Sequence, residues 1–164
     1  MILGMTTFTF VHVVLSLIGI ATGFFVLFGM FKSKRMPGMT ALFLLTTIAT
    51  SATGFGFPFD HLLPSHKVGI ISLVILAVAL LALYGRNLSG RWRGVYVVTA
   101  VMALYLNVFV LVAQLFQKVA PLRALAPTGA EPPFFIAQGV VLLVFIVLGT
   151  MAFKRFRPAR SLFS

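Results

Sequence analysis

The chain has 164 residues, of which 60% are hydrophobic and 9% are charged, with a mean hydropathy of +1.11. Such a low charge content is not typical of a soluble domain, so most side chains must face lipid or neighbouring helices. The absence of cysteine excludes disulfides, thiolate metal sites and thiol–disulfide chemistry, and with them a quinone-linked disulfide oxidase.

The net charge of +11 does not indicate nucleic-acid binding, because the basic residues gather at the ends of apolar runs. That distribution is typical of residues that set membrane topology, and it favours contact with anionic lipid. We therefore expect membrane lipids, and no nucleic acid, among the partners of this chain.

The chain contains five apolar runs, each long enough to cross a hydrocarbon layer of ~30 Å. They predict an all-α bundle of five transmembrane helices that forms a single membrane domain, residues 1–164. Turn residues such as Pro37-Gly38, or clusters of basic residues, separate the runs. The predicted spans are residues 8–31, 39–57, 67–85, 94–116 and 133–153.

Basic residues are unevenly divided between the two sides of this predicted bundle. The segments that follow the first, third and fifth runs hold ten of them, and the opposite side holds three. The positive-inside rule then places the amino terminus outside and the carboxyl terminus in the cytoplasm of a bacterial-type inner membrane. The sequon Asn87-Leu88-Ser89 falls on the cytoplasmic side, so we do not expect it to be glycosylated.

In this orientation, both acidic residues and all three histidines lie at or near the outer face. Asp60, His61 and His66 share the connection before the third run, and Glu131 precedes the fifth run. His12 lies about four residues into the first run, roughly 6 Å below its outer end. The sequence therefore predicts a cluster of histidines and acids at one membrane surface.

Within this cluster, His66 is expected to be the better ligand. Ser65 is a candidate N-cap of the third helix, which places His66 in the first helical turn. The partial positive charge at a helix start disfavours imidazolium and keeps the ring neutral. Gly69, three residues on, leaves room beside the ring for a flat or bulky group.

The cluster has three interpretations. Two neutral imidazoles, His12 and His66, are suited to ligating a haem b iron in an electron-transfer protein. Imidazole and carboxylate together are suited to a divalent metal such as zinc, iron or copper. The plainest interpretation is that these side chains are interfacial polar residues bonded to loop backbone, water or Lys67. The candidate ligands are His12, His61, His66, Asp60 and Glu131.

Each run also carries a stripe of small or polar residues at helical spacing. Such stripes either let helices pack closely, with hydrogen bonds between them, or form the walls of a cavity. Asn107, near the middle of the fourth run, is expected to have a specific partner. The polar residues that the sequence singles out are Asn107, Gln114, Gln138, Thr50 and Ser16.

On the opposite, basic side, Trp92 stands between Arg91 and Arg93. This pattern predicts an anchor in the lipid interface, and the alternative is a surface that docks a partner.

Several catalytic classes have no sequence signature here. The chain has no Walker loop, no nucleophile-elbow serine and no zincin motif, so we do not expect an enzyme. No ionisable side chain lies deep within a run, which argues against a proton-coupled transporter.

We therefore predict a small binding or accessory subunit of a redox-linked inner-membrane complex, with the outer cluster as its ligand site. The alternatives are a bis-histidine haem b electron carrier and a channel or carrier for a small neutral solute. Because so small a bundle exposes much apolar surface, we expect it to associate with other membrane subunits or with copies of itself.

Overall fold

The computed structural model describes residues 4–58, 60–61 and 64–159, and every element assigned in them is a helix. The predicted all-α class is therefore confirmed. Long helices occupy the five apolar segments, and a short helix lies in the connection before the last of them. The elements are α1 (Thr7–Phe31), α2 (Pro37–Gly54), α3 (Pro64–Leu80), the π-helical turn η1 (Leu81–Gly85), α4 (Trp92–Lys118), α5 (Ala120–Leu125) and α6 (Pro132–Arg155).

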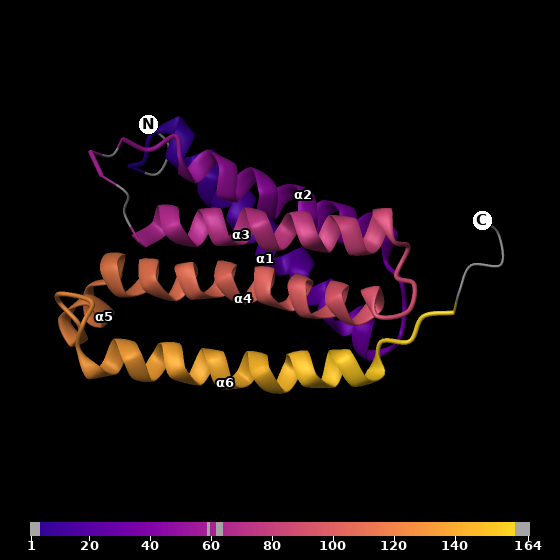
Figure 1. The fold of residues 1–164 in the computed structure, drawn as a ribbon. Coiled ribbons are helices and arrows are strands. Elements are labelled where there is room, and N and C mark those ends of the chain that lie inside the picture. Colours follow the sequence, from indigo (N-terminus) through magenta and orange to yellow (C-terminus); the bar gives the residue numbers. More distant parts are fainter. Residues whose placement is uncertain (1–3, 59, 62–63, 160–164) are drawn as a thin grey trace.

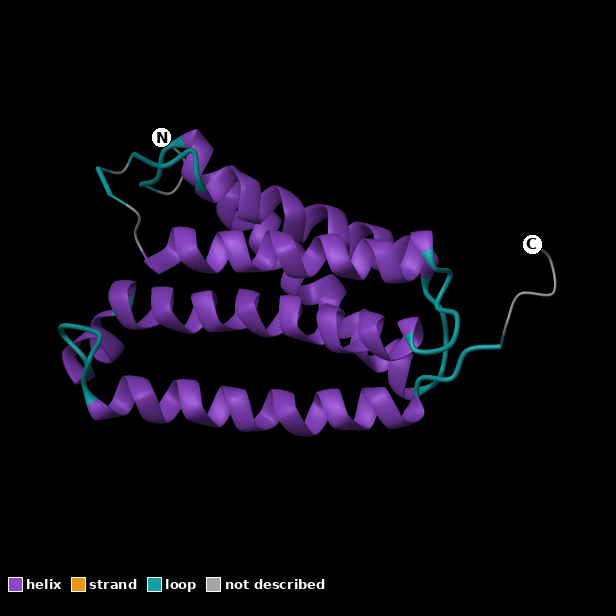
Figure 2. Cartoon of the chain, viewed as in Figure 1, coloured by secondary structure: helices purple, strands orange, loops and turns teal. Residues whose placement is uncertain are grey.

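The long helices lie side by side, and their connections gather at two ends of the molecule (Figure 1). One end, here called the histidine end, holds the start of α1, the α2–α3 connection and α5. The other end, the basic end, holds residues 32–36, residues 86–91 and the segment 156–159 after α6 (Figure 2). Helix α4 contacts α1, α3, α5 and α6, so it forms the centre of the bundle.

Four helices are long and apolar enough to cross a membrane, namely α1, the continuous helix Pro64–Gly85, α4 and α6. This property fits a multi-pass membrane protein. Helix α2 is not among the four; it has 18 residues and is rich in threonine.

Some helix boundaries differ from those expected. Helix α2 ends at Gly54, and the following Phe55 N–H donates to the carbonyl of Ala52 at 3.2 Å. Helix α3 begins at Pro64, so the expected N-cap role of Ser65 is wrong, and Ser65 lies inside the first turn. Proline is favoured at a helix start because its missing N–H has no partner there in any case.

Three helices approach one another closely at Gly23 of α1. A Cβ atom at this position would lie 2.6 Å from Leu104 Cδ1 of α4 and 2.9 Å from Phe43 Cε2 of α2. Both neighbours are almost completely buried, so neither side chain can move into solvent. Three helices therefore meet at a point that only glycine can occupy.

We predict that Gly23→Val lowers the stability of the folded bundle by about 1–3 kcal/mol, because the added side chain overpacks this contact. Thermal unfolding of the detergent-solubilised protein measures the effect. The matched control is Gly139→Val on α6, where an added Cβ meets nothing within 4 Å. Equal unfolding temperatures for the two variants would contradict the packing described here.

Candidate functional site

His12 lies on α1 at the histidine end, half-buried, and reaches across to α2. Its Nδ1 is 2.8 Å from Thr53 Oγ1, and its ring meets the Phe57 ring edge-on with centroids 5.1 Å apart. The register of the two antiparallel helices explains the pairing. Gly19 of α1 packs against Thr46 of α2, and seven residues along each helix from that contact, roughly 10 Å, lie His12 and Thr53.

The hydrogen bonds of Thr53 determine which ring nitrogen of His12 carries the proton. Thr53 Oγ1 donates its single hydrogen to carbonyls of its own helix, at 2.7 Å to Ala49 and 3.2 Å to Thr50. With its hydrogen used in this way, the same oxygen accepts from His12, and we therefore expect the neutral ring to carry its hydrogen on Nδ1. His12 Nε2 then has a lone pair, and it has no hydrogen-bond partner among the described residues.

His66 occupies a different environment. It is the third residue of α3, as the sequence predicted for the first turn, and its side chain is only 3% exposed. The Phe55 ring lies beside it, with centroids 5.5 Å apart. A Cβ on Gly69 would lie 3.3 Å from the same Phe55 ring. The space that Gly69 leaves beside His66 is therefore filled by a flat ring from the chain itself.

The remaining candidate ligands, Asp60, His61 and Glu131, are more exposed to the surroundings than His66. Asp60 and His61 are exposed in the α2–α3 connection, which includes positions outside the described residues. Across the described part of the chain, no group of three or more histidine, aspartate or glutamate side chains is placed to hold a metal ion.

The Glu131 carboxylate is hydrogen-bonded to residues of its own loop. Its carboxylate accepts hydrogen bonds from Thr128 Oγ1 at 2.7 Å and from the backbone N–H groups of Thr128 and Ala130, each at 3.1 Å. The bond from the Thr128 hydroxyl is the main cause of a pKa below the ordinary value of a glutamate, because these donors favour the ionised form. Glu131 thus orders the turn before α6.

The polar side chains inside the bundle form hydrogen bonds with carbonyls of their own helix or with side chains of a neighbouring helix. Asn107 Nδ2 donates to Thr47 Oγ1 at 3.2 Å, beside Gly19, which joins α1, α2 and α4 at one polar contact. Ser16 and Thr50 donate to carbonyls of their own helices, and Gln114 is half-buried. This pattern is what packing between helices requires.

Gln138 is the exception among these residues. Its Nε2 donates to the carbonyl of Phe109 at 3.0 Å, which joins α6 to α4. Its Oε1 is buried and has no partner within the described residues. This oxygen is the one buried side-chain acceptor there that remains unpaired.

The basic end is held together by hydrogen bonds that the sequence did not reveal. Arg93 Nη1 donates to the carbonyls of Phe153 and Phe156 at 2.9 and 2.6 Å, so Arg93 caps the end of α6. The Arg157 N–H donates to Ser33 Oγ at 2.7 Å. Trp92 is half-buried, and the Arg86 guanidinium lies 5.3 Å from its ring centroid.

Sequence reasoning named the histidines but not the residues that surround them. Thr53, Phe55 and Phe57 define the environments of His12 and His66, and the capping role of Arg93 was also missed. The weak signal for Thr53 is its place on the small-residue stripe of α2, which is the face that meets α1.

No family model, curated protein or solved structure matches this chain. The four long apolar helices fit one class of protein, a multi-pass membrane bundle. Function must be inferred from the chain's own side chains, because a helical bundle hosts many unrelated functions.

We predict that neutral His12 carries its proton on Nδ1 and that Thr53→Val removes this preference, because valine offers no acceptor. The ¹⁵N chemical shifts of the labelled imidazole in a membrane mimetic report the tautomer. Thr50→Val is the matched control, since Thr50 bonds to Thr46 on its own helix. A protonated Nε2 in the unsubstituted protein would contradict the assignment.

Proposed function

We propose that this chain is a small binding or accessory subunit of a redox-linked inner-membrane complex, with its ligand site centred on His12 at the outer surface. The observation that carries the proposal is the hydrogen bond from His12 Nδ1 to Thr53, which leaves Nε2 as a lone-pair donor. Neutral imidazole with one nitrogen oriented by a second residue is the form that binds metal ions and haem iron.

The proposal includes five spans, with α2 as the fifth. An α-helix of 18 residues is about 27 Å long, close to a ~30 Å hydrocarbon core. Its threonine hydroxyls donate to carbonyls one turn earlier, as Thr46 does to Leu42 and Thr50 to Thr46. These bonds satisfy the polar groups within the helix and reduce the cost of placing them in the membrane.

The same proposal places the basic end in the cytoplasm and the histidine end outside. Lys32, Lys34 and Arg35 lie together at the basic end with residues 86–91 and the end of α6. Both acids, Asp60 and Glu131, lie at the histidine end. This division supports the orientation expected from the positive-inside rule.

We predict that a membrane-impermeant thiol reagent labels Pro58→Cys on intact cells, whereas Lys34→Cys reacts only after permeabilisation. The chain contains no cysteine, so each variant reports one position. Thr128→Cys and Ser89→Cys are matched controls, expected to behave like Pro58→Cys and Lys34→Cys respectively. If Lys34→Cys and Pro58→Cys react from the same side, α2 does not span the membrane.

Two occupants suit the His12 site, and they differ in their second ligand. A bis-histidine haem b needs a second imidazole, and His66 is the candidate, although Phe55 must then move from beside it. A divalent cation would draw its other ligands from the exposed residues Asp60 and His61, which must then move toward His12, since the described residues hold no preformed group of three such ligands. The Asn107–Thr47 bond joins α4 to α2 inside the bundle, and such pairing of polar side chains with one another favours both over a channel for a neutral solute.

We predict that the purified protein carries a haem Soret band or a stoichiometric metal, and that His12→Ala removes it. Thr53→Val should weaken binding by about 10–100-fold, because it removes the residue that orients the imidazole. Visible spectroscopy and elemental analysis measure both occupants. Loss with His66→Ala identifies haem ligation, and loss with Asp60→Asn identifies a divalent metal.

The matched control for these variants is Thr50→Val, which leaves the His12–Thr53 pair intact. Absence of both a Soret band and a bound metal, after expression with ample haem and metal, would exclude the proposed ligand site.

The accessory role requires a surface for other subunits or for a second copy of the chain. Helix α6 supports it, because its outward side chains include Phe135, Ile136 and Leu143, each more than 60% exposed. In a membrane this face meets either lipid or another transmembrane helix.

A further inference from the structure

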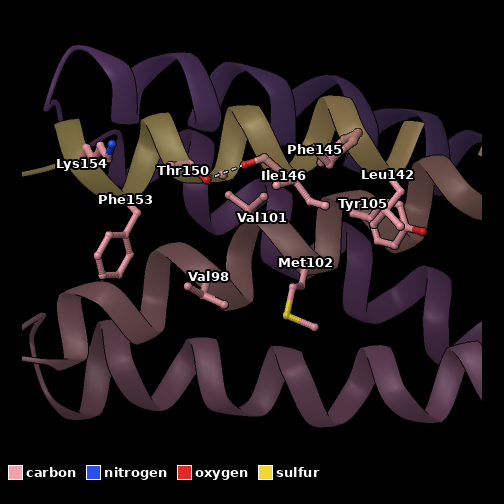
Figure 3. A pocket seen from close by; sticks show the side chains of 11 residues that line it. Val98, Val101, Met102, Tyr105, Leu142, Phe145, Ile146, Thr150, Phe153 and Lys154 are labelled. Carbon is pink, nitrogen blue, oxygen red and sulfur yellow. Dashed lines mark hydrogen bonds between the residues drawn. The ribbon is translucent and has the colours of Figure 1, made fainter. Parts of the chain in front are cut away.

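A continuous apolar groove runs between α4 and α6 on the outside of the bundle. One cavity of about 380 Å³ adjoins a second of about 580 Å³, and Val98 and Phe153 line both. Figure 3 shows Lys154 and Phe153 at one end of the first cavity and Tyr105 and Leu142 at the other. The groove therefore leads from the basic end of the bundle toward its middle.

The length of the groove matches one membrane leaflet. Gly94 lines the second cavity and Tyr105 lines the first, eleven residues further along α4. At ~1.5 Å per residue this separation is roughly 16 Å. Half of a ~30 Å hydrocarbon core is about 15 Å. A groove that starts at one membrane surface would thus end near the bilayer centre.

Three cations line the surface end of the groove. Arg91 and Arg93 line the second cavity, and Lys154 lines the first. The only two acids of the chain, Asp60 and Glu131, lie at the opposite, histidine end, so neither compensates these charges. A complementary ligand must bring negative charge to this end.

Arg93 is oriented in advance for such a ligand. Its Nη1 is held by the carbonyls of Phe153 and Phe156, and its guanidinium lies 5.3 Å from the Phe153 ring centroid. These contacts fix the side chain but leave its remaining N–H donors without a partner among the described residues. A fixed guanidinium with unused donors is well suited to a phosphate oxygen.

We propose that this groove binds one anionic phospholipid, with its phosphate at Arg91, Arg93 and Lys154 and an acyl chain along α4 and α6 toward Tyr105. The cations at one end are complementary to an anionic headgroup, and the apolar side chains along the groove are complementary to an acyl chain that spans one leaflet. The site lies at the opposite end of the bundle from His12 and does not depend on the occupant proposed there.

Native mass spectrometry of the full-length protein, with equimolar phosphatidylglycerol and phosphatidylcholine of identical acyl chains, tests the proposal. We expect selective retention of phosphatidylglycerol at one lipid per chain. Arg91→Gln and Lys154→Gln should each lower the preference by about fivefold, as expected for one cation near an anionic headgroup. Both residues are exposed, so the fold should persist, and circular dichroism verifies it.

Two further variants separate the groove from general charge attraction. Lys67→Gln/Lys118→Gln removes two cations at the histidine end and should leave the preference unchanged. Val98→Phe narrows the groove at the position that both cavities share, where the side chain is 46% exposed, and should reduce retention.

Several outcomes would overturn the proposal. Equal retention of the two lipids would exclude selectivity for an anionic headgroup. A loss of preference with Lys67→Gln/Lys118→Gln equal to that with Arg91→Gln or Lys154→Gln would assign the preference to net charge alone. Unchanged lipid retention in Val98→Phe would show that the acyl chain does not bind in this groove. Displacement of the lipid by excess glycerol phosphate would identify a site for a soluble phosphate instead.

Discussion

At the middle of the bundle, α1, α2 and α4 come together because Gly19 and Gly23 place no side chain between them. A Cβ at Gly23 would overlap Leu104 and Phe43, and one at Gly19 would lie 3.1 Å from Thr47 Oγ1. Asn107 completes the contact by its bond to Thr47. In lipid, where apolar surfaces gain little by associating, close packing and such hydrogen bonds are what hold helices together.

This contact also sets the register of α1 against α2, and the register determines which side chains meet at the histidine end. His12 meets Thr53 because both lie seven residues from the contact between Gly19 and Thr46. The tautomer of His12 then follows from the bonds that Thr53 makes within its own helix. A local hydrogen bond on α2 thus favours one tautomer of a histidine on α1.

The two ends of the bundle differ in charge, and each end has its own chemistry. Thr128 and Ala130 hold the Glu131 carboxylate at the histidine end. At the basic end the charges have no acidic side chain as counterpart, and the Arg93 guanidinium bonds to the backbone carbonyls of Phe153 and Phe156 instead. Such an arrangement leaves positive charge available to anionic lipid.

The helical character of the five apolar segments and the separation of the basic residues from the acids were predictable from the sequence, whereas the ligand cluster at the histidine end stays a prediction. Hydropathy and charge position are properties of single segments, so they can be evaluated from the sequence without knowledge of the tertiary structure. The role of α2 was less predictable, since its threonines lower the hydropathy of a helix whose polar groups are satisfied internally.

What only the tertiary structure decided is which side chains meet. Thr53 beside His12, Phe55 beside His66 and Arg93 at the end of α6 each join different helices or segments. These contacts depend on the relative register and rotation of helices, which hydrophobic periodicity leaves open. The sequence alone determined that polar and charged side chains gather at the two ends of an apolar bundle, and packing around Gly19 and Gly23 decided that His12 meets Thr53.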